Sequence, residues 1–135
     1  VKQALRWKPR YIFIGEVRTQ QAAQGILRAA TSGHMTLCTV HGGSVEETIS
    51  AIVQNAISGP MGMQVEQVYS LLADGLCGII HQKLIGNKPS LQIINTDTNS
   101  NCKIRRALKE AGKTGKSLDL QSAINSQHKD RNSNN

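Results

Sequence analysis

Two polar side chains, a carboxylate and an imidazole, each follow a short apolar run in the first third of the chain. Glu16 comes just after the run Tyr11–Ile14, and His41 comes directly after residues 35–40. A carboxylate can orient a water molecule or contact a divalent cation. An imidazole can donate a hydrogen bond to an anion and changes its charge near neutral pH. If the two runs are neighbouring strands, both groups reach the same edge of one sheet.

The residues around this pair predict a strand–helix–strand unit. The run Tyr11–Ile14 is continuous, apolar and rich in β-formers, which is typical of a strand buried on both faces in a parallel sheet between helices. Residues 35–40 are predicted to be a second such strand. Thr19 is the predicted N-cap of the intervening helix, and Gly33 is its predicted stop. Such a unit is a right-handed crossover, and open α/β sheets bind ligands at the carboxyl ends of their strands. The apolar stripe of the helix consists of Ala22, Ala23, Ile26, Leu27 and Ala30.

Two segments carry a resemblance to a known family. Residues 12–18, Ile-Phe-Ile-Gly-Glu-Val-Arg, resemble the Walker B segment of secretion and pilus-motor ATPases. The segment from Thr31-Ser-Gly-His34 to Thr39-Val-His41 resembles their histidine box. The family includes type IV pilus retraction motors, type II secretion ATPases, and type IV secretion or conjugation ATPases. The similarity covers residues 4–84 and continues more weakly to residue 126.

The resemblance implies roles for four residues. Glu16 is implied to be the catalytic Walker B glutamate, which activates or positions the attacking water and also contacts the metal, Mg²⁺. His41 is implied to sense the γ-phosphate of ATP. Arg18 and His34 are candidate nucleotide contacts; as a cation two residues after Glu16, Arg18 could also hold Glu16 in place. Arg18 is equally well explained as a surface arginine, and His34 as a structural residue that bonds a neighbouring loop.

The chain departs from the family pattern in two places. The family has Arg-Asp followed by Glu-Thr, whereas this chain has Arg18-Thr19 followed by Gln21-Ala22, so two carboxylates are missing. Residues 112–117, Gly-Lys-Thr-Gly-Lys-Ser, imitate a phosphate-binding loop. That motif needs a glycine at the position of Glu110 and a preceding strand, so we interpret residues 112–117 as a linker. The family's Walker A loop, aspartate box and N-terminal sensing domain are then expected to precede Val1, and we expect the chain to be a fragment.

A zinc site is a competing interpretation of His34, Cys38 and His41. Side chains alternate between the faces of a strand, which separates His41 from the other two, and no second Cys/His pair follows at a suitable spacing. The three cysteines, an odd number spread along the chain, imply no disulfide framework and predict reduced cytosolic thiols. The sequence contains no signal-peptide pattern and no apolar run long enough to span a bilayer.

The composition is basic. The 135 residues carry a formal net charge of +7, which favours anionic partners or serves solubility alone. A basic nucleic-acid-binding module is therefore one alternative function. Only four residues are Trp, Tyr or Phe, and Trp7 is the one expected to be exposed, so base stacking is poorly supported. The densest group of cations is Lys103, Arg105, Arg106, Lys109, Lys113 and Lys116.

The remaining segments predict mainly helices. Residues 44–47, Ser-Val-Glu-Glu, form a capping box for a helix that ends at Gly59-Pro60. A further helix is predicted over residues 64–84, then a turn at residues 86–89 and a strand over residues 91–94, near a sheet edge. Another short helix is expected to close at Gly112. Ser117 is expected to cap a last helix with Leu120, Ala123 and Ile124 inward.

The expected fold is α/β, the C-terminal part of a RecA-like P-loop ATPase core with a small helical C-terminal region. Residues 1–97 are assigned to the core, 98–126 to the helical region and 127–135 to a disordered tail. The resemblance implies ATP hydrolysis with Mg²⁺ in a hexamer that powers pilus assembly or retraction, type II or IV secretion, or conjugative transfer. It implies a cytoplasmic protein bound peripherally to inner-membrane platform proteins, without direct nucleic-acid contact. A truncated, non-catalytic ATPase remnant is the other alternative.

Overall fold

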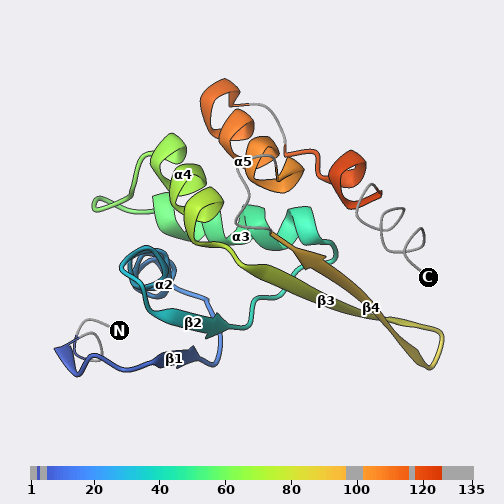
Figure 1. Cartoon of the computed structure of the whole chain (residues 1–135), viewed down its shortest axis with the longest axis horizontal. Helices are drawn as coiled ribbons and strands as arrows, with labels where there is room; N and C mark the ends of the chain where they lie inside the picture. The colour runs from blue at the N-terminus through green and yellow to red at the C-terminus, as the bar shows by residue number, and fades with distance from the viewer. Residues whose placement is uncertain (1–2, 4–5, 97–101, 116–117, 126–135) are drawn as a thin grey trace.

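The chain forms helices that pack over a parallel strand pair and a separate hairpin (Figure 1). The computed structural model describes residues 3, 6–96, 102–115 and 118–125. None of the helices in these ranges is long and apolar enough to cross a membrane. The elements, in chain order, are β1 (Tyr11–Ile14), α2 (Gln20–Thr31), β2 (Met35–Cys38), α3 (Val45–Ile57), α4 (Val65–Gly75), β3 (Gly78–Ile85), β4 (Lys88–Asn95) and α5 (Lys103–Thr114).

The predicted strand–helix–strand unit is confirmed. Strands β1 and β2 are parallel, with Tyr11 opposite Met35, and α2 connects them. The Thr19 side chain accepts a hydrogen bond from the Ala22 amide at 3.2 Å and so begins the helix. After the C-cap, Gly33 has a φ of +87°, a conformation that glycine adopts without strain and that turns the chain into β2.

The expectation that these strands are buried on both faces is wrong for the described residues. Ile12 faces the helices and is 6% exposed, whereas Phe13 is 72% exposed and Leu37 is 53% exposed. The sheet has two strands, and α2 covers one side of it (Figure 1). The run of β-formers therefore predicted both strands correctly, but it gave no information on whether a second layer covers them.

Helix α3 begins at the predicted capping box. The Ser44 hydroxyl accepts a hydrogen bond from the Glu47 amide at 3.1 Å, and the Glu47 carboxylate accepts one from the Gly43 amide at 2.8 Å. In the usual form the glutamate bonds the amide of the cap residue itself, so this box is shifted by one residue. The buried face of α3 packs against α2 and α4 and consists of Val45, Ile49, Ile52, Val53 and Ala56.

The helix predicted over residues 64–84 is wrong in its second half. Helix α4 ends at Gly75, and β3 begins at Gly78 and pairs with the antiparallel β4. The turn between them is Gly86-Asn87, with a φ of +61° at Gly86, so the turn predicted over residues 86–89 is confirmed in its first half. Residues 88 and 89 belong to β4, which is longer than the predicted strand. Ile79 and Ile80 fit both the periodicity of a helix and that of a strand, and their β-branched side chains favour the strand.

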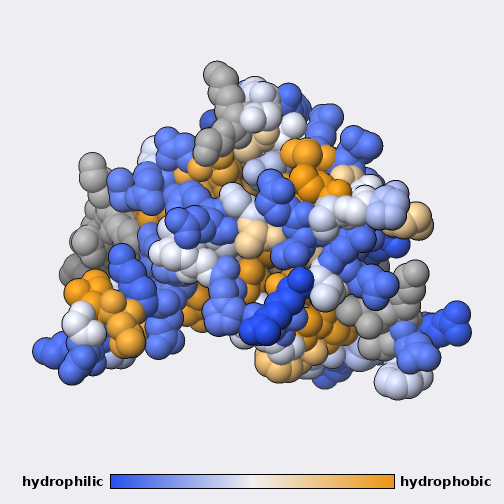
Figure 2. Space-filling model, turned by 180° about the vertical axis from the view of Figure 1, so that it is seen from behind, coloured by the Kyte–Doolittle hydropathy of each residue, from blue (hydrophilic) through white to orange (hydrophobic). Residues whose placement is uncertain are grey.

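The hairpin leaves the body of the molecule as a two-stranded ribbon (Figure 1). Its register places Ile80 opposite Ile93 and Leu84 opposite Pro89, with Leu91 between them on the same face. Ile80 is 71% exposed and Leu84 is 70% exposed. Figure 2, seen from behind, shows apolar surface at the end of the molecule that carries this hairpin.

Helix α5 passes through Gly112, which was predicted to close it, and ends at Thr114. Gly115, with a φ of +64°, is the C-cap instead. A Cβ at Gly112 would lie 2.8 Å from Tyr69 Cβ, so this glycine allows α5 to approach α4 closely. Beyond it Leu120, Ala123 and Ile124 are buried as predicted. Ser117, the expected boundary at 97/98 and the expected tail at residues 127–135 lie outside the described residues.

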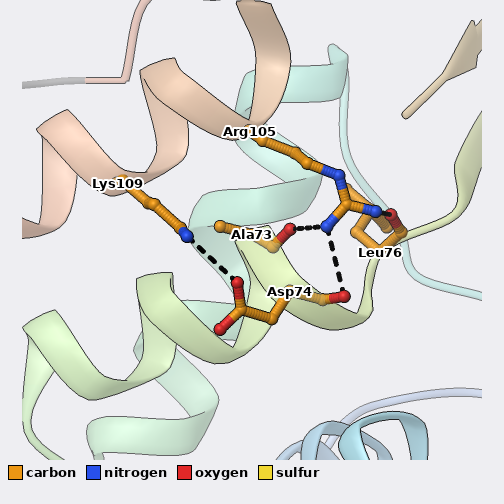
Figure 3. Close-up of polar contacts among 5 residues, drawn as sticks. All are labelled: Ala73, Asp74, Leu76, Arg105 and Lys109. Atoms are coloured by element: carbon orange, nitrogen blue, oxygen red, sulfur yellow. Dashed lines mark hydrogen bonds and ion pairs between the residues drawn. The ribbon is translucent and has the colours of Figure 1, made fainter. Parts of the chain in front are cut away.

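The contact between α4 and α5 includes two cations from the basic cluster (Figure 3). The Arg105 guanidinium donates to the carbonyl of Ala73 and, at 3.2 Å, to that of Asp74, both near the C-terminal end of α4. Lys109 Nζ lies 3.1 Å from the Asp74 carboxylate. These carbonyls carry the negative end of the helix dipole, so a cation is favoured there.

Candidate functional site

Glu16 comes just after β1, where the chain is still hydrogen-bonded to the residues that follow β2. The Val17 amide donates to the Thr39 carbonyl at 3.0 Å, and the Thr39 hydroxyl donates to the Gly15 carbonyl. Val17 is 4% exposed and packs into the core. Since side chains alternate along an extended chain, the neighbours of Val17, Glu16 and Arg18, point away from the core and toward the same side.

Glu16, Arg18 and His41 form one cluster at this edge. Arg18 Nε lies 2.5 Å from Glu16 Oε1, and His41 Nε2 lies 3.1 Å from the same oxygen. The expectation that the carboxylate and the imidazole reach one edge of the sheet is therefore confirmed.

The electrostatics of the cluster keep Glu16 ionised. The hydrogen bond from Arg18 is the largest cause that lowers the pKa of Glu16, and the charges of Arg18 and His41 lower it further, against a partial loss of hydration. The carboxylate raises the pKa of Arg18 in return. A carboxylate with a lowered pKa is a weak proton acceptor, but it remains a good hydrogen-bond acceptor and cation ligand near neutral pH.

The His41 side chain is 86% exposed and makes little packing contact. Its position therefore depends on the backbone around it. The two residues after it are glycines that lie against other elements. A Cβ at Gly42 would lie 2.5 Å from Thr48 Oγ1 and 2.8 Å from the Thr48 amide nitrogen, so a side chain does not fit there. The Gly42 carbonyl accepts a hydrogen bond from His81 Nε2 at 3.0 Å. Sequence reasoning missed His81, because its partner lies 39 positions away.

His34 lies at the opposite end of β2 from His41. Seven positions of extended chain correspond to roughly 20 Å, so the structure does not bring His34 to Glu16. Its Nδ1 lies 3.2 Å from the Ser32 hydroxyl, which itself donates to the Ala29 carbonyl at 3.0 Å. The contacts of His34 are thus with the turn that ends α2.

Among the described residues no group of three or more His, Cys, Asp or Glu side chains could hold a metal ion. Cys38, from the competing zinc interpretation, is partly buried, and this burial raises the pKa of its thiol. Glu16 provides one ionised carboxylate. That fits Mg²⁺, which is commonly bound by one or two carboxylates together with waters and substrate phosphates.

The nucleic-acid interpretation receives mixed support. Trp7 is 80% exposed, but Tyr11 and Phe13 are also exposed, so the expectation that Trp7 alone would be accessible is wrong. The reason is the uncovered face of β1. Arg105 and Lys109 of the basic cluster contact α4 (Figure 3). These two contacts argue against a nucleic-acid-binding surface at this cluster.

Comparisons with known proteins agree on one family. The family model described as "Type II/IV secretion system protein" matches residues 1–130. The competence protein ComGA of Halalkalibacterium halodurans is 33% identical over 102 residues, which are 76% of this chain and 26% of that protein. The type IV pilus retraction ATPase PilT of Pseudomonas aeruginosa is 33% identical over 85 residues, which are 63% of this chain and 24% of that protein.

Solved structures of such proteins resemble this one. The pilus retraction motor PilT with bound ADP superposes with a TM-score of 0.64 at 35% identity, covering 81% of this chain and 31% of that one. The ATPase DotB of Yersinia pseudotuberculosis gives a TM-score of 0.73 over 93% of this chain and 32% of that one; at 23% identity this likeness concerns the fold alone. The chain thus spans about a quarter to a third of these proteins. With residues 1–130 matched, the chain belongs to the Type II/IV secretion system protein family.

Proposed function

We propose that this chain is the later part of a RecA-like ATPase core and that it hydrolyses ATP within a longer secretion or pilus motor. The observation that carries the proposal is the meeting of Glu16 and His41 at the end of two parallel strands, in a chain of this family. Residues 12–18 would be the Walker B segment and residues 31–41 the histidine box. The structure of PilT with bound ADP supports nucleotide binding by this fold.

In this proposal Glu16 orients the attacking water more than it removes a proton. A general base works best with a pKa near the working pH, whereas Arg18 lowers that of Glu16. An ionised carboxylate is a strong hydrogen-bond acceptor, so Glu16 can accept a hydrogen bond from water. Arg18 keeps the carboxylate in one orientation through its contact with Oε1.

His41 would contact the γ-phosphate. Its Nε2 lies 3.1 Å from Glu16 in the structure, and the highly exposed ring can turn from the carboxylate to a phosphate oxygen. A donor placed beside the transferred group stabilises the charge that develops on it. Mg²⁺, held in part by Glu16, would neutralise phosphate charge. His34 remains a candidate nucleotide contact only if another subunit or segment brings nucleotide to the other end of β2.

The wider assembly is also part of the proposal. The motor would be a homo-hexamer on the cytoplasmic side of the inner membrane, peripherally bound to platform proteins, without direct contact to nucleic acid. Residues 1–97 would belong to the core, 98–126 to a helical region and 127–135 to a tail. The process would be pilus assembly or retraction, type II or IV secretion, or conjugation. Relatives among pilus and secretion proteins support the first two of these classes.

The test replaces Glu16 in the longer protein that contains this chain and a phosphate-binding loop. Glu16→Gln should lower ATP turnover about a hundred- to ten-thousandfold, because the amide presents one oxygen and no charge, while nucleotide binding measured by calorimetry stays close to wild type. Glu110→Gln, an exposed glutamate on α5, is the matched control and should leave turnover unchanged.

Two results would contradict the proposal. Wild-type turnover in Glu16→Gln would remove Glu16 from the reaction. A longer protein that lacks a phosphate-binding loop, or that binds but never hydrolyses ATP, would support the non-catalytic remnant instead.

A further inference from the structure

One peptide unit beside His41 is held at both of its ends by side chains from two different elements. The carbonyl of Gly42 and the amide of Gly43 belong to the same peptide group. His81 Nε2, from β3, lies 3.0 Å from the carbonyl oxygen, and Glu47 Oε2, from α3, lies 2.8 Å from the amide nitrogen. We call the Gly42–Gly43 peptide with His81 and Glu47 the peptide clamp.

The chemistry of the contact fixes the role of His81. A carbonyl oxygen can only accept a hydrogen bond, so His81 must carry a hydrogen on Nε2 and donate it. The acceptor on the other side is a carboxylate, which gives the stronger charge-assisted form of hydrogen bond. The two bonds pull on opposite ends of one peptide dipole and therefore oppose its rotation.

The position of the clamp explains why it is needed. Two consecutive glycines are the most mobile pair of residues a backbone can have, and Gly42 cannot be replaced without striking Thr48. His41 directly precedes this pair, and its exposed ring has no packing to hold it. The orientation of the ring toward Glu16 thus depends on the backbone that follows it.

We propose that His81 is a positioning residue that, with Glu47, fixes the Gly42–Gly43 peptide and so holds His41 beside Glu16. The consequence for turnover rests on the proposed ATPase function, whereas the effect on His41 does not. The clamp also links the hairpin to the candidate site, since His81 of β3 bonds to the loop after β2.

The first test uses the chain itself and three variants. His81→Leu removes the donor, His81→Gln restores an amide N–H close to the position of Nε2, and Gln92→Leu changes the residue directly opposite His81 on β4. In His81→Leu the Gly43 amide should exchange with solvent about fivefold faster, and ¹³C relaxation should show a less ordered His41 ring. Both effects should be reversed in His81→Gln and absent in Gln92→Leu.

Unchanged Gly43 exchange or an unchanged His41 ring in His81→Leu would overturn the proposal. So would the same loss in Gln92→Leu, because the effect would then come from the hairpin as a whole.

The second test measures turnover in the longer protein. His81→Leu should lower kcat about ten- to a hundredfold with KM for ATP and the melting temperature nearly unchanged, since only alignment is lost. His81→Gln should recover most of kcat. Loss of His41 order without loss of kcat would overturn the catalytic part of the inference. A wild-type protein without turnover would instead refute the proposed function, while the first test still decides on the clamp.

Discussion

Glu16 is contacted by the guanidinium of Arg18 and the imidazole of His41, and these two neighbours define its chemistry. Oε1 is used by Arg18 and His41. The pairing with Arg18 lowers the pKa of Glu16 and favours its ionised form, so a charged acceptor lies at this edge of the sheet. A residue in this state suits the ordering of water or cations better than proton transfer.

Replacing Arg18 with Met should raise the pKa of Glu16 toward its ordinary value of 4.5, because the largest cause of the lowering is removed. An NMR titration of the Glu16 carboxyl carbon measures this. A lowered pKa in the folded state stabilises the fold above the unfolded value, and that contribution disappears as the pH falls through the folded value. The difference in unfolding free energy between wild type and Arg18→Met should therefore shrink below about pH 4.5.

Arg28→Met is the control for this prediction, because Arg28 is also exposed but lies in the last turn of α2. It should leave the Glu16 titration unchanged. A Glu16 pKa that does not move in Arg18→Met would show that the ion pair does not persist in solution.

At the residue scale, the sequence predicted the part of the site that depends on local rules. Glu16 and His41 follow apolar strands directly, so the rule that parallel strands end at one edge was sufficient to place them together. His81 follows no such rule. It lies inside a strand, and its contact with Gly42 depends on how the hairpin packs, which no local pattern encodes.

At the scale of elements, α5 is fixed to α4 by Arg105. Its guanidinium donates to carbonyls at the C-terminal end of α4, where the backbone has no helical partners of its own (Figure 3). Arg105→Met should lower the free energy of unfolding by about 1.5–3 kcal/mol, the usual contribution of hydrogen bonds to a charged group. Urea denaturation followed by circular dichroism measures the change.

Arg106→Met is the matched control, because Arg106 is adjacent and exposed. It should change stability by less than about 0.5 kcal/mol. Equal effects of the two substitutions would mean that the charge of α5, and not the contact with α4, stabilises the helix pair.

The two wrong element predictions have one physical origin. A helix was predicted through Gly78, and another was predicted to end at Gly112, because both were judged from local sequence. Pairing with β4 favours the strand from Gly78 onward. The close approach of Tyr69 explains why a glycine lies inside α5, since a side chain at this position would strike Tyr69. The helix continues through the glycine.

At the scale of the whole molecule, apolar side chains are left uncovered on the hairpin and on β1–β2. Ile80 and Leu91 are 71% and 58% exposed on one face of the hairpin. Exposed apolar ribbons promote association. The variant with Ile80→Thr and Leu91→Thr should therefore self-associate less, as measured by sedimentation velocity, and should melt within a few degrees of wild type.

Ile94→Thr provides the contrast, since Ile94 is 1% exposed on the opposite face of the same hairpin. It should lower the melting temperature clearly, because a hydroxyl replaces buried apolar surface. If the double variant self-associates as much as wild type, another surface must be responsible for self-association.

The crossover through α2 limits which insertions the segment between β1 and β2 can accept. Every pair in the β1–β2 ladder joins residues 24 positions apart, and α2 occupies half of that interval with both of its ends capped. One inserted residue would rotate the rest of the helix by about 100° and turn its apolar stripe away from the core. Natural length variants of this segment should accordingly differ by whole helical turns or place their extra residues in the short links.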